Sequence, residues 1–217
     1  MMLNQFTLRQ TYELVGEATT AWNQVEGLWF LIFTALMRDT ERDITDALYD
    51  MFQTGAMQRQ LIMKVAPIAL KYDLKGLKRQ NPDHQIRKKL LTRTGQLNAE
   101  TNGIVSRRNA MTHTAFEDWG GPTLIAISPH KASKLRNEDH IRYLTELIED
   151  TTLLLINLAD LRDMFIDWLD PGSRERSNEI MRRAGYRVLE DERNKERERL
   201  LQAVALRTPP PPLPSAE

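Results

Sequence analysis

Apolar residues in the first part of the chain recur every three or four positions. Between residues 15 and 36 they stand at Val15, Ala18, Trp22, Val25, Trp29, Ile32 and Leu36. This alternation is typical of a helix that packs lengthwise against other helices. Charged residues then dominate positions 38–43. We therefore predict one long helix that ends before this charged stretch.

Two further segments keep the spacing of a helix but contain possible breaks. Residues 44–72 have one near Gly55 and another at Pro67, whose ring removes a backbone donor, so we predict two pieces there. Residues 84–116 are helical as well, with apolar residues seven apart at Leu90, Leu97, Ile104 and Met111. Asn102-Gly103 is a helix-stop signal. This segment is therefore either one helix or two, the second with Ser106 as its N-cap.

A strongly apolar helix is predicted later in the chain. Before this helix, residues 123–128 are expected to form either a small hairpin or an extended loop. Residues 138–169 then carry an apolar seam and a flanking row, up to the stop at Asp170-Pro171-Gly172. The seam is Leu144, Leu147, Leu154, Leu158, Leu161, Phe165 and Trp168, and the row is Ile141, Ile148 and Leu155. So broad an apolar face predicts a place in the centre of a bundle or at a dimer interface.

The composition changes after Ser173. Alternating positive and negative charges predict an exposed helix outside the core, and PPPPLP predicts an extended, disordered tail rather than a docking ligand. The fold class is therefore all-α: an antiparallel bundle of four to five main helices with a charged C-terminal helix. We predict three parts, namely a bundle at 1–170, a charged helical extension at 171–207 and a proline-rich tail at 208–217.

Charge and cysteine content narrow the chemistry. The 217 residues include no cysteine, which excludes disulfides, thiol nucleophiles and cysteine-bound zinc. Net charge is zero, which argues against a nonspecific nucleic-acid coat, but basic clusters at 87–89, Arg93 and 107–108 are candidates for brief RNA contacts. We recognise neither a membrane span nor a secretion signal, so a cytoplasmic location is expected.

A catalytic imidazole can come from few positions, namely His84, His113, His130 and His140. His84, His130 and His140 have sequence neighbours typical of solvated surface residues. No two of the four histidines have the spacing of a zinc site, so neither a metal nor a cofactor is predicted. His113 differs. In a helix it stands about 40° from Asn109, so the two side chains share a face. Arg108 stands about 140° from His113, but its long side chain can reach around.

Arg108 also departs from the pattern around it. In a continuous helix it falls within the apolar stripe of Leu97, Ile104, Met111 and Ala115. A charge at such a position indicates a functional site or a buried ion pair. The ion-pair alternative gives Arg108 a partner such as Glu26 or Glu100.

The segment RRNAMTH resembles the signature of the HEPN superfamily, in which an Arg and a polar residue are followed by three variable residues and a His. The match falls on Arg108, Asn109 and His113, and the order of helices fits the HEPN bundle over residues 6–169. Many HEPN proteins are RNases of toxin–antitoxin, phage-defence and RNA-targeting CRISPR systems. The resemblance implies a metal-independent endoribonuclease that leaves 2′,3′-cyclic phosphate ends.

The resemblance also implies a homodimer, because each chain supplies one motif and the family places two motifs in one cleft. His113 would then act as base or acid, and Arg108 would hold the scissile phosphate. Asn109 would orient the imidazole or a phosphate oxygen. Arg107 and Arg93 are candidate RNA-binding residues. A cognate antitoxin or regulatory protein is a further expected partner. The alternative function is a noncatalytic helical scaffold or sensor.

Overall fold

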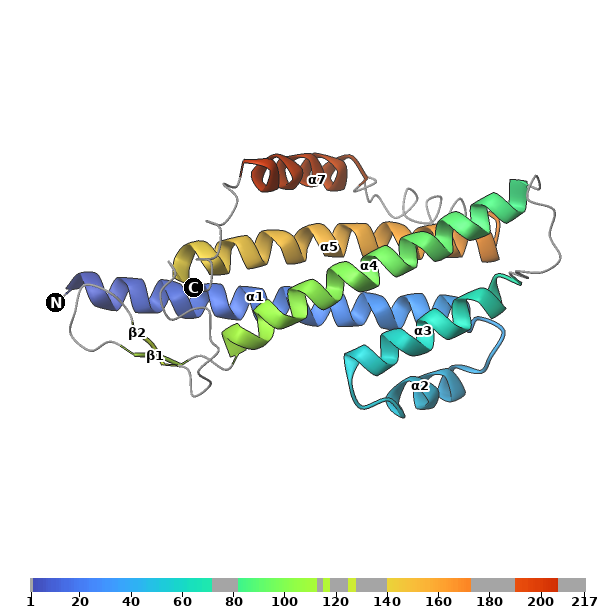
Figure 1. Cartoon of the computed structure of the whole chain (residues 1–217), viewed down its shortest axis with the longest axis horizontal. Coiled ribbons are helices and arrows are strands. Elements are labelled where there is room, and N and C mark those ends of the chain that lie inside the picture. The colour runs from blue at the N-terminus through green and yellow to red at the C-terminus, as the bar shows by residue number, and fades with distance from the viewer. Residues whose placement is uncertain are drawn as a thin grey trace, which may run out of the picture.

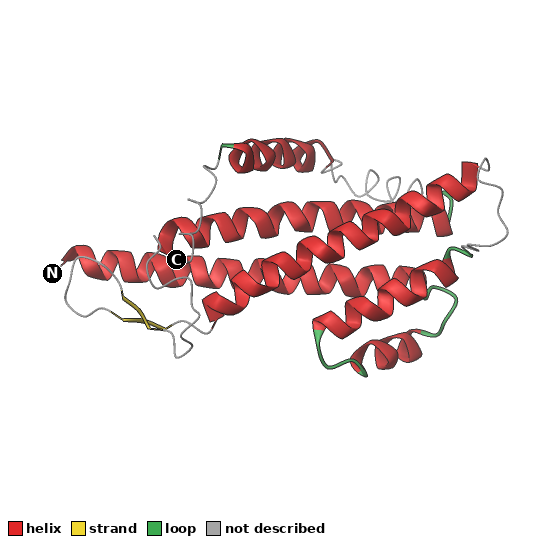
Figure 2. Cartoon of the chain, in the orientation of Figure 1, coloured by secondary structure: helices red, strands yellow, loops and turns green. Residues whose placement is uncertain are grey.

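We analysed a computed structural model of the chain, which describes residues 2–71, 82–112, 115–117, 125–127, 140–172 and 190–206. Helices dominate these residues, so the all-α class is confirmed (Figures 1 and 2). The helices are α1 (Met2–Leu36), α2 (Arg42–Asp50), α3 (Gly55–Ala69), α4 (Pro82–Thr112), α5 (His140–Leu169) and α7 (Glu190–Ala205). None of them is long and apolar enough to cross a membrane.

The long helices α1 and α5 lie side by side and run in the same direction, while α4 crosses them in the opposite direction (Figure 1). Their shared core contains Trp29, Ile32, Phe33, Leu90, Leu97, Met111, Leu144, Leu147 and Phe165. Burying each of these large side chains contributes roughly 1.5–3 kcal/mol. The indole of Trp29 also makes a hydrogen bond inside the core, since its Nε1 donates to Thr101 Oγ1 at 3.2 Å. The apolar spacing of the predicted helices therefore points to the true core.

The predicted break near Gly55 is confirmed, because α2 ends at Asp50 and α3 begins at Gly55. The side chain of Thr54 caps α3 by accepting from the backbone N–H of Met57. The predicted interruption at Pro67 is wrong, since α3 continues to Ala69. Pro67 lies in the last turn of α3, where one missing backbone donor is offset by packing of the buried residues before it.

The stop signal at Asn102-Gly103 does not divide α4, which is one helix of 31 residues. The Asn102 side chain accepts from Arg59 Nη2 at 2.7 Å, so a contact to α3 occupies the amide. The helix ends at Thr112, earlier than predicted. Ala115 is therefore not part of a helical stripe. It belongs to β1 (Ala115–Glu117), which pairs antiparallel with β2 (Ile125–Ile127). β2 lies within the segment 123–128, but its partner strand lies before that segment, whereas the predicted hairpin is confined to residues 123–128.

The end of α5 and the helix after it show how the C-terminal part contacts the bundle. Gly172 follows α5 with a φ of 87°, a conformation that favours glycine. The charged helix α7 packs on α5, where Arg197 forms an ion pair with Asp160 and Leu200 is 1% exposed. The prediction that this helix contributes nothing to the core is thus wrong at Leu200. The proline-rich segment lies outside the described residues.

Candidate functional site

The last turns of α4 carry the candidate motif. Arg107, Arg108 and Asn109 all lie within the helix, which ends at Thr112. His113 is the next residue and lies outside the described residues. The structure therefore places the arginine and asparagine of the motif, and the shared face of Asn109 and His113 stays a prediction.

Arg108 occupies a core position of α4. Its stripe neighbours Leu97, Ile104 and Met111 are 0%, 8% and 1% exposed, and Arg108 itself is half-buried. Its guanidinium carbon lies 6.0 Å from the centre of the Trp22 ring on α1, and its Nη1 donates to Asn109 Oδ1 at 3.2 Å. The ring face attracts the cation, while the amide orients it. Both of these contacts are with uncharged groups.

The two acids suggested by the ion-pair alternative make other contacts. Glu26 Oε1 accepts from Trp22 Nε1 at 3.0 Å. Glu100 lies 3.7 Å from Arg93. Glu26 thus holds the indole over which Arg108 lies, whereas Glu100 faces an arginine about four turns before the motif.

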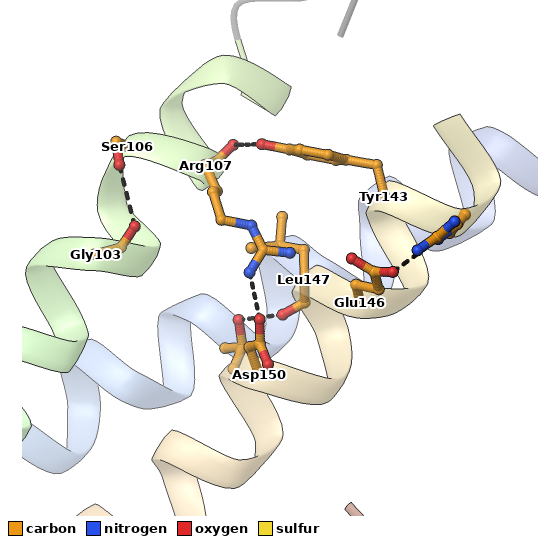
Figure 3. A network of polar contacts seen from close by, with 9 residues as sticks. Gly103, Ser106, Arg107, Tyr143, Glu146, Leu147 and Asp150 are labelled. Atoms are coloured by element: carbon orange, nitrogen blue, oxygen red, sulfur yellow. Dashed lines mark hydrogen bonds and ion pairs between the residues drawn. The ribbon is translucent and has the colours of Figure 1, made fainter. Parts of the chain in front are cut away.

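Arg107 instead forms an ion pair that joins α4 to α5 (Figure 3). Its Nη1 contacts Asp150 Oδ2, and its guanidinium carbon lies 5.4 Å from the centre of the Tyr143 ring. The Tyr143 hydroxyl donates to the backbone carbonyl of Arg107 at 3.1 Å. These three contacts fix the end of α4 on α5. An RNA-binding role for Arg107 would have to compete with Asp150, and it stays a prediction.

Arg93, the other candidate RNA contact, lies at a different place on α4. It lines a cleft between α4 and α5 of about 470 Å³. Fifteen residues separate it from Arg108, which is about 22 Å along a helix axis. The structure therefore brings Arg108 and Asn109 together and leaves Arg93 well away from them.

A polar cluster around the buried Arg59, beside the motif, was not predicted from the sequence. Arg59 of α3 is only 3% exposed, and it donates to the side-chain oxygens of Asn98 at 3.2 Å and Asn102 at 2.7 Å. The two asparagines are four apart and so lie on one face of α4. That spacing is the signal that could have indicated a shared partner. The cluster ties α3 to α4 one turn and a half before the motif.

Burial changes the proton affinities within this cluster. Removal from water lowers the pKa of Arg59, because it penalises the charged guanidinium. Burial likewise raises the pKa of Tyr49 to about 12, against an opposing effect of the positive Arg59. Tyr49 therefore keeps its proton beside Arg59 at neutral pH.

The sequence predictions for the other three histidines compare differently with the structure. His84 is 9% exposed, so the prediction of a solvated surface residue is wrong, because the first turn of α4 turns this side chain into the protein. His140 is the first residue of α5, within the helix start that was predicted. His130 lies outside the described residues. His84 is therefore a buried structural residue far from the motif.

No family model matches the chain, and neither the curated proteins nor the solved structures contain one with significant similarity to it. The HEPN resemblance therefore depends on the residues of the motif and on the helical fold. Site geometry has to carry any functional argument.

Proposed function

We propose that this protein is a metal-independent endoribonuclease with Arg108, Asn109 and His113 in its active site. The observation that carries the proposal is the position of Arg108. A guanidinium held half-buried in a stripe of fully buried residues costs desolvation energy, and such exceptions concentrate at functional sites. Trp22 and Asn109 hold Arg108 near the end of α4. The helix ends at Thr112, the residue before His113.

The chemistry follows from what these side chains can do. An imidazole removes the proton from the 2′-hydroxyl, whose oxygen attacks the adjacent phosphorus. The bond from phosphorus to the 5′-oxygen breaks, and a second, protonated imidazole supplies a proton to that oxygen. The products are a 2′,3′-cyclic phosphate and a 5′-hydroxyl. Arg108 would bind the scissile phosphate and offset the charge that develops on its oxygens.

A symmetric homodimer would supply the second imidazole. One chain provides one His113, so two copies related by a twofold axis would bring two histidines and two arginines to one cleft. Asn109 is exposed, its Oδ1 accepts from Arg108, and in this proposal its amide would orient an imidazole or a phosphate oxygen. A monomer at working concentration in analytical ultracentrifugation would contradict this composite site. Toxin or defence roles, with an antitoxin or regulator as partner, belong to the same proposal.

The test is cleavage of mixed cellular RNA by purified protein in the presence of EDTA. We expect cleavage by the wild type with cyclic phosphate ends, and none by the Arg108→Ala/His113→Ala double variant. Arg142→Ala is the matched control, since Arg142 is a surface arginine paired with Glu146 one turn away on α5. Equal cleavage by the wild type and the double variant would overturn the proposal.

A second candidate function is supported by a separate surface. An apolar groove of about 630 Å³ lies between α1 and α5, lined by Gly27, Leu28, Leu31, Leu155 and Ile156 among others. Exposed apolar grooves of this kind are typical of protein-binding faces. It favours a noncatalytic interaction module, which predicts no RNA turnover and a tightly bound protein partner.

A further inference from the structure

The cleft between α4 and α5 that contains Arg93 has a basic wall. Lys88, Lys89 and Arg93 line it from α4, together with Gln85 and Gln96, and Asn157 faces them from α5. Lys88 and Lys89 are both exposed. Cationic side chains at the edge of a hollow between two helices attract phosphate groups without burying them. We call this hollow, about 470 Å³ in volume, the α4–α5 cleft.

The acidic residue of the cleft is compensated from another part of the chain. Asp160 of α5 lines the cleft and would repel an anion there. Arg197 of α7 forms an ion pair with this carboxylate, and the side chains are 25% and 38% exposed. The docked helix α7, which lies along α5 in Figure 1, thereby keeps the local charge of the cleft positive. This gives the charged C-terminal helix a specific task.

A second hollow continues along the same pair of helices toward the motif. It measures about 240 Å³ and is lined by Glu100 and Arg107 of α4 and by Asp150 of α5. Its two carboxylates also face arginines, since Asp150 pairs with Arg107 and Glu100 lies 3.7 Å from Arg93. The path from Gln85 to Arg107 covers about 33 Å at 1.5 Å per residue. It ends one residue before Arg108, whose side chain points about 100° further around α4, toward Trp22 of α1.

The form of this path favours one strand of RNA over a duplex or an acidic protein. At about 3.4 Å per nucleotide in a stacked strand, 33 Å corresponds to on the order of ten nucleotides. Two packed helices have axes only about 8–10 Å apart, so the hollow is a narrow surface groove that fits one strand better than a duplex. The amides of Gln85, Gln96 and Asn157 can bond to base edges and to the 2′-oxygens of ribose, groups that an acidic peptide lacks.

We propose that the α4–α5 cleft binds a single strand of RNA through its phosphates, and that α7 maintains this affinity by pairing Arg197 with Asp160. The inference rests on the proposed function, because it supplies a substrate path that ends at the turn of α4 that carries Arg108. The inference concerns RNA binding, whereas the proposed function concerns RNA cleavage, so the two can be measured separately.

The experiment is fluorescence anisotropy with a labelled 12-nucleotide, fully 2′-O-methylated RNA, which has no attacking hydroxyl. We expect the Lys88→Glu/Lys89→Glu variant to raise Kd at least tenfold and to flatten the salt dependence, because each phosphate contact contributes about −0.7 to the slope for a single strand. Arg197→Ala should raise Kd two- to fivefold. The control is Arg42→Glu/Lys64→Glu, which makes the same change in net charge at exposed positions of α2 and α3 and should leave Kd within twofold.

Three outcomes would overturn the inference: equal Kd for the cleft variant and the control variant, tighter binding of duplex RNA than of the single strand, or displacement of the RNA by poly-glutamate at equal concentration. Cleft-dependent RNA binding by a wild-type protein that never cuts RNA would support the inference while contradicting the proposed function. RNA cleavage by the wild type, together with an unchanged Kd for RNA in the Lys88→Glu/Lys89→Glu variant, would contradict the inference while supporting the proposed function.

Discussion

Two adjacent arginines at the end of α4 have different surroundings. Arg107 reaches α5, where a carboxylate and a tyrosine hold it. Arg108 points about 100° further around the helix, toward α1, and contacts an indole and an amide. The side chains are chemically identical, so helix phase alone directs one toward a carboxylate on α5 and the other toward an indole on α1. The comparison teaches that a pair of basic residues in sequence need not share one function.

The largest expected difference between them is in catalysis. Arg108→Ala should lower kcat for RNA cleavage by 10²- to 10³-fold, or about 3–4 kcal/mol, because a preorganised donor to the developing charge is lost. Arg107→Ala should lower kcat by less than tenfold. Single-turnover cleavage of a defined oligonucleotide measures both. If Arg107→Ala proves the more damaging, the assignment of the two arginines is reversed.

A third arginine extends the comparison to stability. Arg59→Ala should reduce the free energy of unfolding by about 3 kcal/mol, because Asn98 and Asn102 lose their donor and a buried cavity remains. Urea denaturation followed by circular dichroism measures the loss. Arg42→Ala, an exposed pair with Asp46, is the control and should change stability by less than about 0.5 kcal/mol. A loss for Arg59→Ala as small as that of the control would contradict a structural role.

The neighbour of Arg59 gives a pH test with a defined sign. Tyr49 has a pKa of about 12 in the folded protein against 10.0 when unperturbed. Below pH 10 both states keep the proton; above it the unfolded chain ionises first, so stability falls as pH rises from 10 toward 12. The wild type should lose about 1 kcal/mol more than Tyr49→Phe between pH 9 and pH 11. Parallel unfolding curves for the two proteins would show that burial does not perturb Tyr49.

The smallest expected effect is the coupling of Arg107 to Asp150. Their side chains are 30% and 20% exposed, so solvent weakens the pair. A double-mutant cycle with Arg107→Ala and Asp150→Ala should give an interaction energy of about 0.5–1 kcal/mol. Thermal unfolding at low and high salt should show this coupling shrinking as salt rises. A coupling energy of zero would remove the reason for treating Arg107 as an anchor.

The sequence predicted the helices that carry the motif better than the points where they end. Apolar residues seven apart marked the buried stripe of α4, and all of them are buried. Pro67 and Asn102-Gly103 are local stop signals that do not end their helices, because packing stabilises the helices through them. Contacts between α3 and α4 decide whether a helix ends at such a signal or continues through it. Within a helix a glycine costs about 1 kcal/mol and a proline about 3 kcal/mol, and the burial of several core side chains outweighs either.

The sequence by itself determined the all-helical class, the position of Arg108 within a buried stripe and the absence of thiol chemistry, because spacing and composition are properties of one chain segment. Tertiary structure alone decided that Arg107 pairs with Asp150, that Asn98 and Asn102 share Arg59, and that α7 neutralises Asp160 beside a basic cleft. Each of these contacts joins residues 37–43 positions apart. Periodicity says which face of a helix is buried, but only the packed helices decide which neighbour that face meets.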